Sequence, residues 1–432
     1  MAIPCITLSR IIPLRSISPL CITSRTMSTD LNRSQMDQHL YSSTMNAEPL
    51  YRYRQGGYHP LTLGECLKAG RYKVLHKLGW GGYSTVWAAR DQREQTYVAV
   101  KISVAETEHN EDMRELQTLK LLASYHPRPK HTVHMLDEFD LKGPNGSHKC
   151  LVYELLGHNV PDMIDANFAD GRLPGKLART IAKQCLIGLD ALHQRKIGHG
   201  DLHTRNLAFA MPYIDDLTEE RFIEMLGKPE VGYVQKRDGK SLEGSVPKYV
   251  VKPASYGNHS WNLAQDVKII DFGESFLHTA PPETLHTPLA LRAPEVIFQD
   301  HIDYGVDLWS MGCMLFELFA GQPPFDTFLT TPTILVGQMR EMAIDELPER
   351  WQDKWNIMNT GDVMATESTG PNLQEWLEEV YFDDLLSPDL TREDIMRLGQ
   401  IVGRLLHFEP SARASARQVL DDPWFNEWPH DK

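Results

Sequence analysis

Paired cysteines are absent from this sequence. Its six cysteines are scattered along the chain and form no C-x-x-C motif: Cys5, Cys21, Cys66, Cys150, Cys185 and Cys313. Structural zinc sites and disulfide frameworks both depend on closely spaced or paired cysteines, so the sequence predicts neither. Isolated cysteines are typical of a protein in a reducing compartment.

Long apolar runs are also absent, because charge, Gly or Pro interrupts every segment before the roughly 20 residues that a membrane-spanning helix needs. Positive charge is in short supply, with 44 Lys and Arg against 58 Asp and Glu and a net charge of −14. We therefore expect neither a membrane nor nucleic acid as a direct partner. The acidic balance suits a basic partner, and an acidic solvated surface explains it equally well.

The first 29 residues contain no acid, while Arg10, Arg15 and Arg25 lie among many Ser and Thr. This composition is typical of a mitochondrial presequence, although three prolines in the same segment would interrupt an amphipathic helix. A disordered tail, or a start upstream of Met27, explains the same residues. We expect residues 1–47 to form a disordered tail and leave mitochondrial import through residues 1–29 as the alternative.

The chain changes character near residue 157. Before it, apolar stretches at 72–78, 84–89 and 97–102 are separated by glycines or polar residues, as in an antiparallel meander. A helical pattern over 111–123 and a short apolar strand over 150–156 follow.

After residue 157 the pattern is mainly helical, with amphipathic spacing over 177–195 and a mostly apolar helix over 305–320. A polar stretch at about 210–265 interrupts two segments that need to be neighbours, so we interpret it as an insertion with a short helix over 217–226. Residues 326–395 are mixed and contain Trp351, Trp355 and Trp376.

The chemistry is concentrated in His199-Gly-Asp-Leu-His-Thr-Arg-Asn206 and, further on, Asp271-Phe-Gly273. In phosphoryl transferases one Asp orients the attacking hydroxyl, while an Asn and a second Asp hold Mg²⁺ against the ATP phosphates. Asp201, Asn206 and Asp271 have that order and spacing. The sequence therefore predicts ATP and Mg²⁺ as cofactors, with Asn206 and Asp271 as the metal ligands.

A glycine-rich hairpin, Leu78-Gly-Trp-Gly-Gly-Tyr-Ser-Thr-Val-Trp87, precedes Lys101 on a later strand. The backbone of such a hairpin can close over phosphates, the Lys can reach them, and Glu115 on the following helix can hold the Lys by an ion pair. The predicted nucleotide-binding residues are Leu78, Gly79, Trp80, Gly81, Gly82, Ser84, Val86, Ala99, Lys101, Glu154 and Leu156. The predicted catalytic residues are Asp201, His203, Asn206, Lys101 and Glu115.

The segments G-G-Y-H-P, G-R-Y and L-G-W-G-x-x-S-T-V-W, the last containing Trp80 and Ser84, resemble the SR-protein kinases, serine/threonine kinases that phosphorylate arginine/serine-rich splicing factors. The resemblance covers roughly residues 50–428. It implies an α+β bilobal protein-kinase fold, with an extension at 48–71 packed on the N-lobe, a β-rich N-lobe and hinge at 72–157, and a mainly helical C-lobe at 158–428.

The resemblance also implies a serine/threonine protein kinase that acts as a monomer in the cytoplasm and nucleus on basic Arg/Ser-rich proteins and serves mRNA splicing. It implies two further roles: Asp307 braces the catalytic loop, and Arg413 pairs with Glu295 of the Ala-Pro-Glu triplet.

Two positions depart from the usual catalytic loop. Gly200 replaces an Arg that contacts a phosphorylated activation segment, so we expect activity without that phosphorylation. His203 replaces a Lys that contacts the γ-phosphate, so we expect a slower enzyme, because a His near its ordinary pKa is a weaker donor at neutral pH. The segment Leu291-Arg-Ala-Pro-Glu295 departs from the family and leaves the Arg/Ser preference open.

Other interpretations of the catalytic loop and of the acidic residues fit the same sequence. The loop H-G-D-L-H-x-x-N also resembles that of choline and aminoglycoside kinases, which predicts a small-molecule kinase, and a pseudokinase scaffold is a third candidate. His199 and His203 are four residues apart, as in some metal pairs. The acidic residues of 326–395 are predicted to form either a groove for a basic peptide or a solvated helix face: Glu341, Asp345, Glu346, Glu378, Glu379, Asp383 and Asp384.

Overall fold

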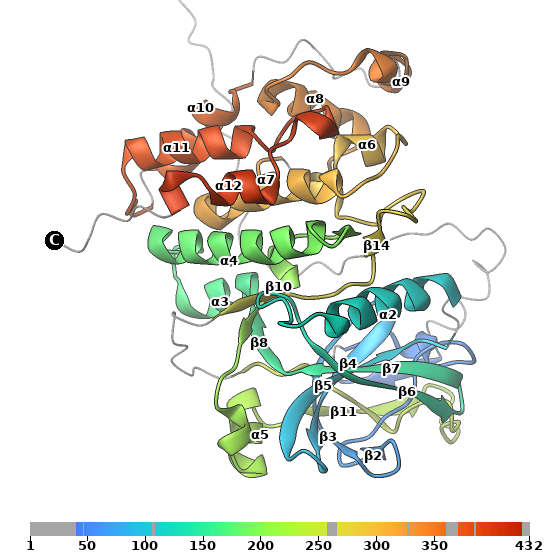
Figure 1. Ribbon diagram of the computed structural model, residues 1–432. Coiled ribbons are helices and arrows are strands. Elements are labelled where there is room, and N and C mark those ends of the chain that lie inside the picture. The colour runs from blue at the N-terminus through green and yellow to red at the C-terminus, as the bar shows by residue number, and fades with distance from the viewer. Residues whose placement is uncertain are drawn as a thin grey trace, which may run out of the picture.

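The computed structural model describes residues 40–45, 47–105, 109–256, 266–325, 329–359, 370–383 and 386–425. The chain folds into a lobe rich in β-strands and a larger helical lobe (Figure 1). This arrangement confirms the predicted α+β bilobal fold.

The N-lobe is built on one antiparallel sheet of six strands in the order β2-β3-β4-β5-β7-β6. The strands span β2 (Cys66–Leu67), β3 (Tyr72–Trp80), β4 (Ser84–Asp91), β5 (Thr96–Ser103), β6 (Met135–Gly143) and β7 (Gly146–Glu154). The meander predicted from the sequence is β3, β4 and β5, and the glycine-rich segment is the hairpin between β3 and β4.

Successive side chains of a strand point to opposite faces of a sheet. Both faces of this sheet are buried, each against its own core. On β5, Tyr97 and Ala99 pack into the large core that includes residues of helix α2 (His109–Ser124). Val98 and Val100 pack into a separate core on the other face. Lys101 follows the spacing of Ala99, which places it on the same face as α2.

A second sheet of three strands, in the order β1-β11-β12, pairs the segment before the N-lobe with the insertion. Its strands are β1 (Tyr41–Ser43), β11 (Val231–Lys236) and β12 (Tyr249–Val251). Val251 of β12 packs on the second face of the six-stranded sheet. The expectation of a disordered tail through residue 47 is therefore wrong at its end, because strand β1 pairs with the insertion. Residues 1–29, with the predicted targeting segment, lie outside the described residues.

The strands on either side of the insertion are direct neighbours. β10 (Leu207–Ala210) pairs with β13 (Val267–Ile269), so that Leu207 lies opposite Ile269, and β10 also pairs with β8 (Leu156–Asn159). The insertion leaves this small sheet, forms α5 (Glu219–Leu226) beside β3, and continues into β11 and β12 (Figure 1).

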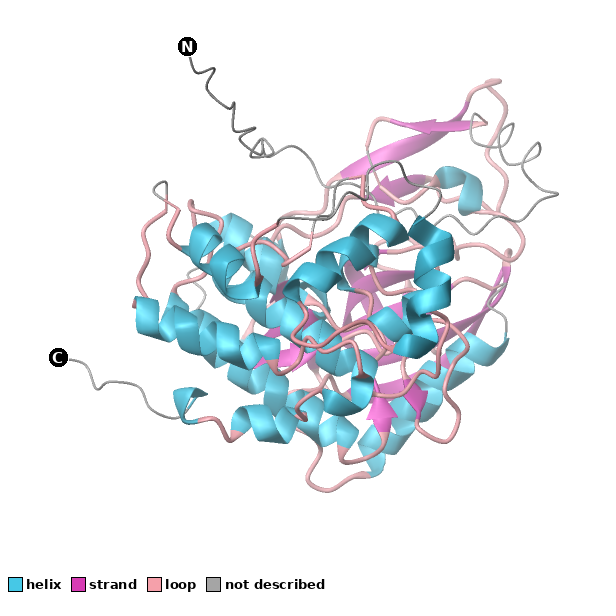
Figure 2. Ribbon diagram, turned by 90° about the horizontal axis from the view of Figure 1, so that it is seen from above, coloured by secondary structure: helices cyan, strands magenta, loops and turns pink. Residues whose placement is uncertain are grey.

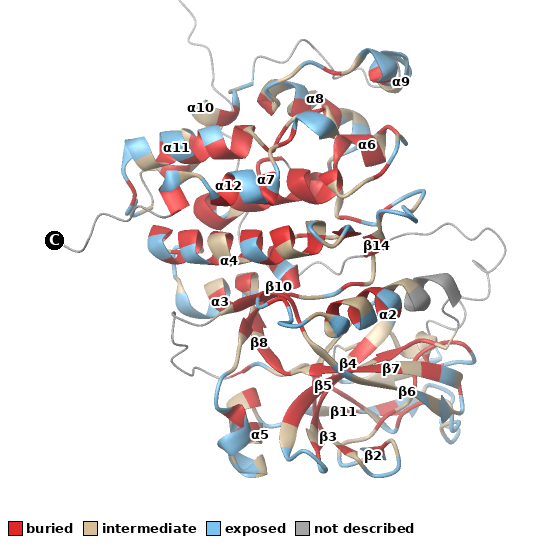
Figure 3. Ribbon diagram, viewed as in Figure 1, coloured by how far each residue is buried: buried red, intermediate tan, exposed pale blue. Residues whose placement is uncertain are grey.

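The C-lobe is organised around α7 (Gly305–Ala320), in which 15 of the residues are buried, as Figure 3 shows by its colour. Its other helices are α3 (Val160–Asn167), α4 (Gly175–His193), α6 (Pro294–Ile297), α8 (Pro332–Met342), α9 (Glu349–Asn359), α10 (Leu373–Tyr381), α11 (Arg392–Gly403) and α12 (Ala416–Leu420). Seen from above, these helices form one mass, with most strands behind or beside them (Figure 2). In the described part of the chain, we find no helix that combines the length and the apolar character of a membrane span.

For the 326–395 region the sequence predicted either an acidic groove or a solvated helix face, and some of its described residues instead serve the interior of the lobe. Trp351 and Trp355 are buried in the core of the lobe rather than lining a surface. Asp345 is used internally, since its carboxylate accepts hydrogen bonds from the backbone N–H groups of Phe408 (2.7 Å) and Glu409 (3.0 Å). Asp384, another residue of the predicted acidic set, lies outside the described residues.

Candidate active site

The catalytic loop follows β9 (Ile197–Gly198) and is held from below by the first turn of α7. The carboxylate of Asp307 accepts hydrogen bonds from the backbone N–H groups of His199 and Gly200, each at 2.8 Å, and His193 Nε2 lies 3.0 Å from it. Burial alone would raise the pKa of Asp307, but the bond from His193 and the nearby His charges outweigh it and lower that pKa. The predicted role of Asp307 as a brace is confirmed.

Gly200 has a backbone reason to be glycine. Its φ is +79°, and a Cβ there would lie 2.5 Å from the carbonyl oxygen of Glu274. The Gly200 carbonyl also accepts a hydrogen bond of 2.8 Å from the Thr287 hydroxyl. A larger residue would therefore clash in this conformation. The same two contacts show that the catalytic loop touches the segment after Asp271 directly.

Asp201, His203 and Asn206 form one cluster at the end of the loop. The Asn206 amide donates to the Asp201 carbonyl at 2.8 Å and lies 3.3 Å from Asp201 Oδ2. His203 Nε2 lies 3.5 Å from the same oxygen and 3.2 Å from the Asn206 amide nitrogen. Sequence reasoning had grouped these three residues, and the structure brings them together.

The second carboxylate oxygen of Asp201, Oδ1, is buried and has no hydrogen-bond partner among the described residues. Leaving a buried acceptor unsatisfied costs about 1–3 kcal/mol, so such atoms are rare unless a ligand completes them. The geometry fits an aspartate that accepts a hydrogen bond from a substrate hydroxyl.

Lys101 lies between two carboxylates. Its Nζ is 2.8 Å from Glu115 Oε1 and 3.1 Å from Asp271 Oδ1, and the Tyr153 hydroxyl donates to Glu115 at 3.0 Å. Burial alone would lower the pKa of Lys101, but the charges of Asp271 and Glu115 outweigh it and raise that pKa. The charge of Lys101 in turn lowers the pKa of Asp271. The predicted ion pair of Lys101 and Glu115 is present.

Asp271 has a φ of +59°, a conformation that a non-glycine residue adopts at some energetic cost. Its side chain is 51% exposed, and the preceding residue, Ile270, donates its N–H to the Asn206 carbonyl at 2.9 Å. Asp271 and Asn206 are thereby neighbours with oxygen atoms available. Mg²⁺ is usually bound by one or two carboxylates together with water and phosphate, so these two residues fit a magnesium site.

The glycines of the β3–β4 hairpin are not required by packing. A Cβ at Gly79, Gly81 or Gly82 would meet no atom within 4 Å. Their bare backbone leaves room for a ligand to approach the N–H groups, as phosphates do in glycine-rich loops. Leu78, Trp80 and Ser84 belong to the same hairpin, and Val86 lies opposite Lys101 in the sheet.

Two predicted nucleotide-binding residues are engaged elsewhere. Both oxygens of Glu154 lie 2.7 Å from Lys268 Nζ, and one of them accepts the backbone N–H of His134. The carbonyl of Leu156 accepts a hydrogen bond of 3.1 Å from Tyr256. The side chain and the backbone N–H of Glu154 are thus both engaged within the protein, the N–H with the His134 carbonyl at 3.1 Å. The sequence did not point to Lys268 or Tyr256, because these partners are 114 and 100 positions away.

The predicted pair of Arg413 and Glu295 is confirmed. Arg413 donates two parallel hydrogen bonds, of 2.6 and 2.7 Å, to the two carboxylate oxygens of Glu295, and both side chains are buried. This geometry fixes the Ala-Pro-Glu triplet to the end of the C-lobe.

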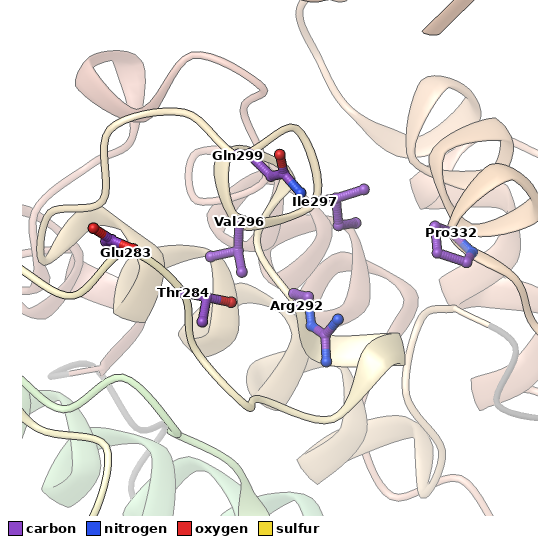
Figure 4. A pocket seen from close by; sticks show the side chains of 7 residues that line it. All are labelled: Glu283, Thr284, Arg292, Val296, Ile297, Gln299 and Pro332. Atoms are coloured by element: carbon purple, nitrogen blue, oxygen red, sulfur yellow. The ribbon is translucent and has the colours of Figure 1, made fainter. Parts of the chain in front are cut away.

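A cavity of about 520 Å³ lies beside this triplet. Figure 4 shows Glu283 and Thr284 on one side, Pro332 on the other, and Arg292 and Val296 between them. Arg292 donates to the Thr287 carbonyl from Nε (3.2 Å) and Nη2 (2.9 Å). The cavity is next to the segment that leads from Asp271 to Glu295, and its lining is mixed: the charged Glu283 and Arg292, the polar Thr284 and Gln299, and the apolar Val296, Ile297 and Pro332.

The alternative of a metal pair at His199 and His203 is wrong. Both ring nitrogens of His199 are engaged, Nε2 at 3.0 Å from the Ile270 carbonyl and Nδ1 as acceptor of the Asp201 N–H at 3.3 Å. Over the described residues, no three His, Cys, Asp or Glu side chains gather into a set suited to a metal ion.

Comparison with known proteins agrees with this geometry. The protein kinase domain matches residues 72–214 and 258–425. The chain is 30% identical to "Serine/threonine-protein kinase SRPK" of Physarum polycephalum, over 87% of this chain and 91% of that protein. It is 25% identical to "Protein kinase dsk1" of Schizosaccharomyces pombe, over 94% and 89% of the two chains. It is 37% identical to human "SRSF protein kinase 3", over 39% of this chain and 30% of that protein.

Proposed function

Because the chain belongs to the protein kinase family, as a serine/threonine kinase of the SR-protein kinase type, we propose that it transfers the γ-phosphoryl group of ATP to serine and threonine hydroxyls of protein substrates. The observation that carries the proposal is that Lys101 contacts Glu115 and Asp271, that Asn206 contacts Asp201, and that the bond from the Ile270 N–H to the Asn206 carbonyl brings the two groups together. These groups match the parts that phosphoryl transfer needs, which are positioning and charge stabilisation.

Each residue has a distinct role in this proposal. The free oxygen of Asp201 accepts the hydrogen bond of the substrate hydroxyl, orients it and takes its proton. Lys101, fixed by Glu115, binds the phosphates beneath the glycine-rich hairpin. Asp271 and Asn206 would hold Mg²⁺, which neutralises phosphate charge when bound. His203, close to Asp201, donates one hydrogen bond toward the transferred group.

A labelling experiment tests this function. The protein is incubated with labelled ATP and Mg²⁺ and with an Arg-Ser peptide, a generic basic protein or choline, beside an Asp201→Ala control. We expect label in the peptide or the basic protein, and its loss in the control. Label in choline alone would support the small-molecule kinase, and no label in any acceptor would support the scaffold.

We propose basic Arg/Ser-rich proteins as the substrate class. The human relative's name, SRSF protein kinase, the net charge of −14 and Glu283 in the cavity beside Arg292 support this assignment. If the Arg-Ser peptide is no better than a Lys-Ser peptide of equal charge, the preference is for charge alone.

We also propose that the enzyme is a monomer of the cytoplasm and nucleus, with mitochondrial import through residues 1–29 as the alternative. Imaging the chain with and without those residues distinguishes the two locations.

We further propose that the segment after Asp271 needs no phosphorylation. Thr287 bonds the catalytic loop at Gly200, Arg292 bonds Thr287, and His286 Nδ1 lies 2.8 Å from Glu274 Oε1. These contacts supply the order that a phosphate and an Arg would otherwise supply. Treatment with a phosphatase is expected to leave the activity unchanged, and an inactive treated enzyme would contradict this.

A further inference from the structure

Two segments outside the residues matched to the protein kinase domain, 40–71 and 215–256, fold together. Ser43 of β1 lies opposite Val234 of β11, and the two segments share a small core in which Tyr53 and Tyr58 pack with valines of the insertion. A Cβ at Gly232 of β11 would lie 2.4 Å from the Cβ of Met45, so the two segments approach as closely as glycine allows. We call these two segments the accessory unit.

The accessory unit is fixed to the N-lobe by buried polar groups. Glu48 forms an ion pair with Lys77 of β3, and both side chains are fully buried. In the turn between β6 and β7, the amide of Asn145 donates to the carbonyls of Tyr58 (2.7 Å) and Ser245 (2.8 Å). One side chain thus joins the extension, the insertion and the six-stranded sheet.

Tyr58 connects the accessory unit to the phosphate-binding hairpin. Its hydroxyl donates a hydrogen bond of 2.7 Å to the carbonyl of Gly81. The ring is buried, lies edge-on to Tyr53 with centroids 5.6 Å apart, and has the Arg52 guanidinium 5.1 Å from its centroid. Burial raises the pKa of Tyr58 to about 12, so its hydroxyl keeps its proton at neutral pH.

This contact determines the orientation of one peptide plane. In a planar trans peptide the C=O and the following N–H point in opposite directions. With the Gly81 carbonyl held by Tyr58, the N–H of Gly82 must point away from the accessory unit. The hairpin has no side-chain packing at Gly79, Gly81 or Gly82 to do this.

We propose that the accessory unit sets the conformation of the phosphate-binding hairpin, and that Tyr58 is the positioning residue through which it acts. Tyr58 touches no substrate; it presents the backbone of the hairpin to the phosphates of ATP. The inference rests on the proposed function, because it assigns the accessory unit to the same nucleotide site.

The test is Tyr58→Phe, which removes one hydroxyl and keeps the ring. Tyr53→Phe is the matched control, because its hydroxyl also lies in the extension but donates to Glu48 rather than to the hairpin. For Tyr58→Phe we expect the KM for ATP to rise about three- to tenfold, as for the loss of one hydrogen bond. The KM for the protein substrate should not change. Hydrogen exchange of residues 79–84, measured without ATP, should become faster.

Tyr53→Phe should lower the unfolding midpoint and leave both the KM for ATP and hairpin exchange as in the wild type. Unchanged exchange at residues 79–84 in Tyr58→Phe, or an unchanged KM for ATP, would overturn the inference. Because exchange is measured without ATP, it still reports on the hairpin if the wild type transfers no phosphate. That result would refute the proposed function by itself.

Discussion

Two lysines of the six-stranded sheet each pair with a glutamate, but the two pairs lie on opposite faces. Lys101 and Glu115 are on the α2 face, with side chains 16% and 5% exposed, and Lys101 also contacts Asp271. On the other face, Lys77 pairs with Glu48 of the accessory unit, with side chains 0% and 1% exposed, and Lys77 Nζ lies 5.2 Å from the centre of the Trp87 ring.

The pKa shifts of the two lysines have opposite directions. For Lys77, burial dominates and lowers the pKa, with Glu48 offsetting only part of the effect. For Lys101, the two carboxylates outweigh burial and raise the pKa. On the α2 face, two carboxylates surround one lysine and leave an excess of negative charge that a cation can neutralise. On the other face, Lys77 and Glu48 form a fully buried, neutral pair, here called the sealed pair. The same residue types serve ligand binding on one face and attachment of a segment on the other.

Breaking the sealed pair should have the largest effect. Lys77→Met leaves Glu48 buried without its cation, which typically costs about 3–5 kcal/mol. We expect urea unfolding to show that loss of stability, while the folded fraction keeps its turnover. The double variant Lys77→Met with Glu48→Leu should recover most of the stability, because it removes both charges. No recovery would mean that the pair is not the source of the loss.

Breaking the partly exposed pair of Lys101 and Glu115 should affect phosphoryl transfer rather than stability. Lys101→Arg keeps the charge, but a guanidinium cannot replace the compact ammonium between Glu115 and Asp271. We expect phosphoryl transfer to fall about 10²- to 10³-fold, as when one preorganised donor is lost. The unfolding free energy should change by less than about 1 kcal/mol. A matched loss of stability and activity would erase the contrast between the two pairs.

Lowering the pH should weaken the packing of His59 in the accessory unit. His59 of the extension is buried against His148, and burial, followed by the charge of His148, lowers the pKa of His59 from 6.5 to about 4. The unfolded chain therefore binds more protons between those values, so stability is complete above pH 6.5 and is lost as the pH falls toward 4. The loss amounts to about 3 kcal/mol.

Unfolding measured at intervals between pH 7 and pH 4 checks this prediction. The variant His59→Phe removes this group and should reduce the pH dependence over that range, while the other buried histidines, His76, His131, His148 and His158, keep their share. An equal slope in the wild type and in the variant would assign the effect to other groups.

The smallest effect concerns His203. A Lys at this position would carry a full charge at neutral pH and donate a stronger hydrogen bond than a neutral imidazole. We expect His203→Lys to raise kcat about two- to fivefold at pH 7.5, in line with a gain near 1 kcal/mol. Steady-state rates at varied ATP measure it, and unchanged turnover and ATP dependence would show that His203 does not limit the reaction.

The catalytic cluster was predictable because its chemistry is local in the sequence. Asp201, His203 and Asn206 lie within six positions, and Lys101 stands on a strand whose alternation fixes its face. The predicted bilobal fold was implied by the resemblance of short motifs to the SR-protein kinases.

The partners that surround the site were not predictable in this way. Glu48 and Lys77 are 29 positions apart, and Glu154 and Lys268 are 114 apart. No periodicity of 2 or 3.6 residues relates such positions, and a charged residue is usually solvated. Glu154 was predicted to bind the nucleotide, and its side chain contacts Lys268.

Strand β1 also has a protective role. It covers one edge of β11, whose other edge is paired with β12. Uncovered edge strands offer free N–H and C=O groups to other chains and promote aggregation. A version of this protein trimmed to the residues matched by the kinase domain at its N-terminal side would leave β11 with an open edge and would uncover Val234. The short strand ahead of the kinase domain thus closes an edge at which another chain could otherwise pair.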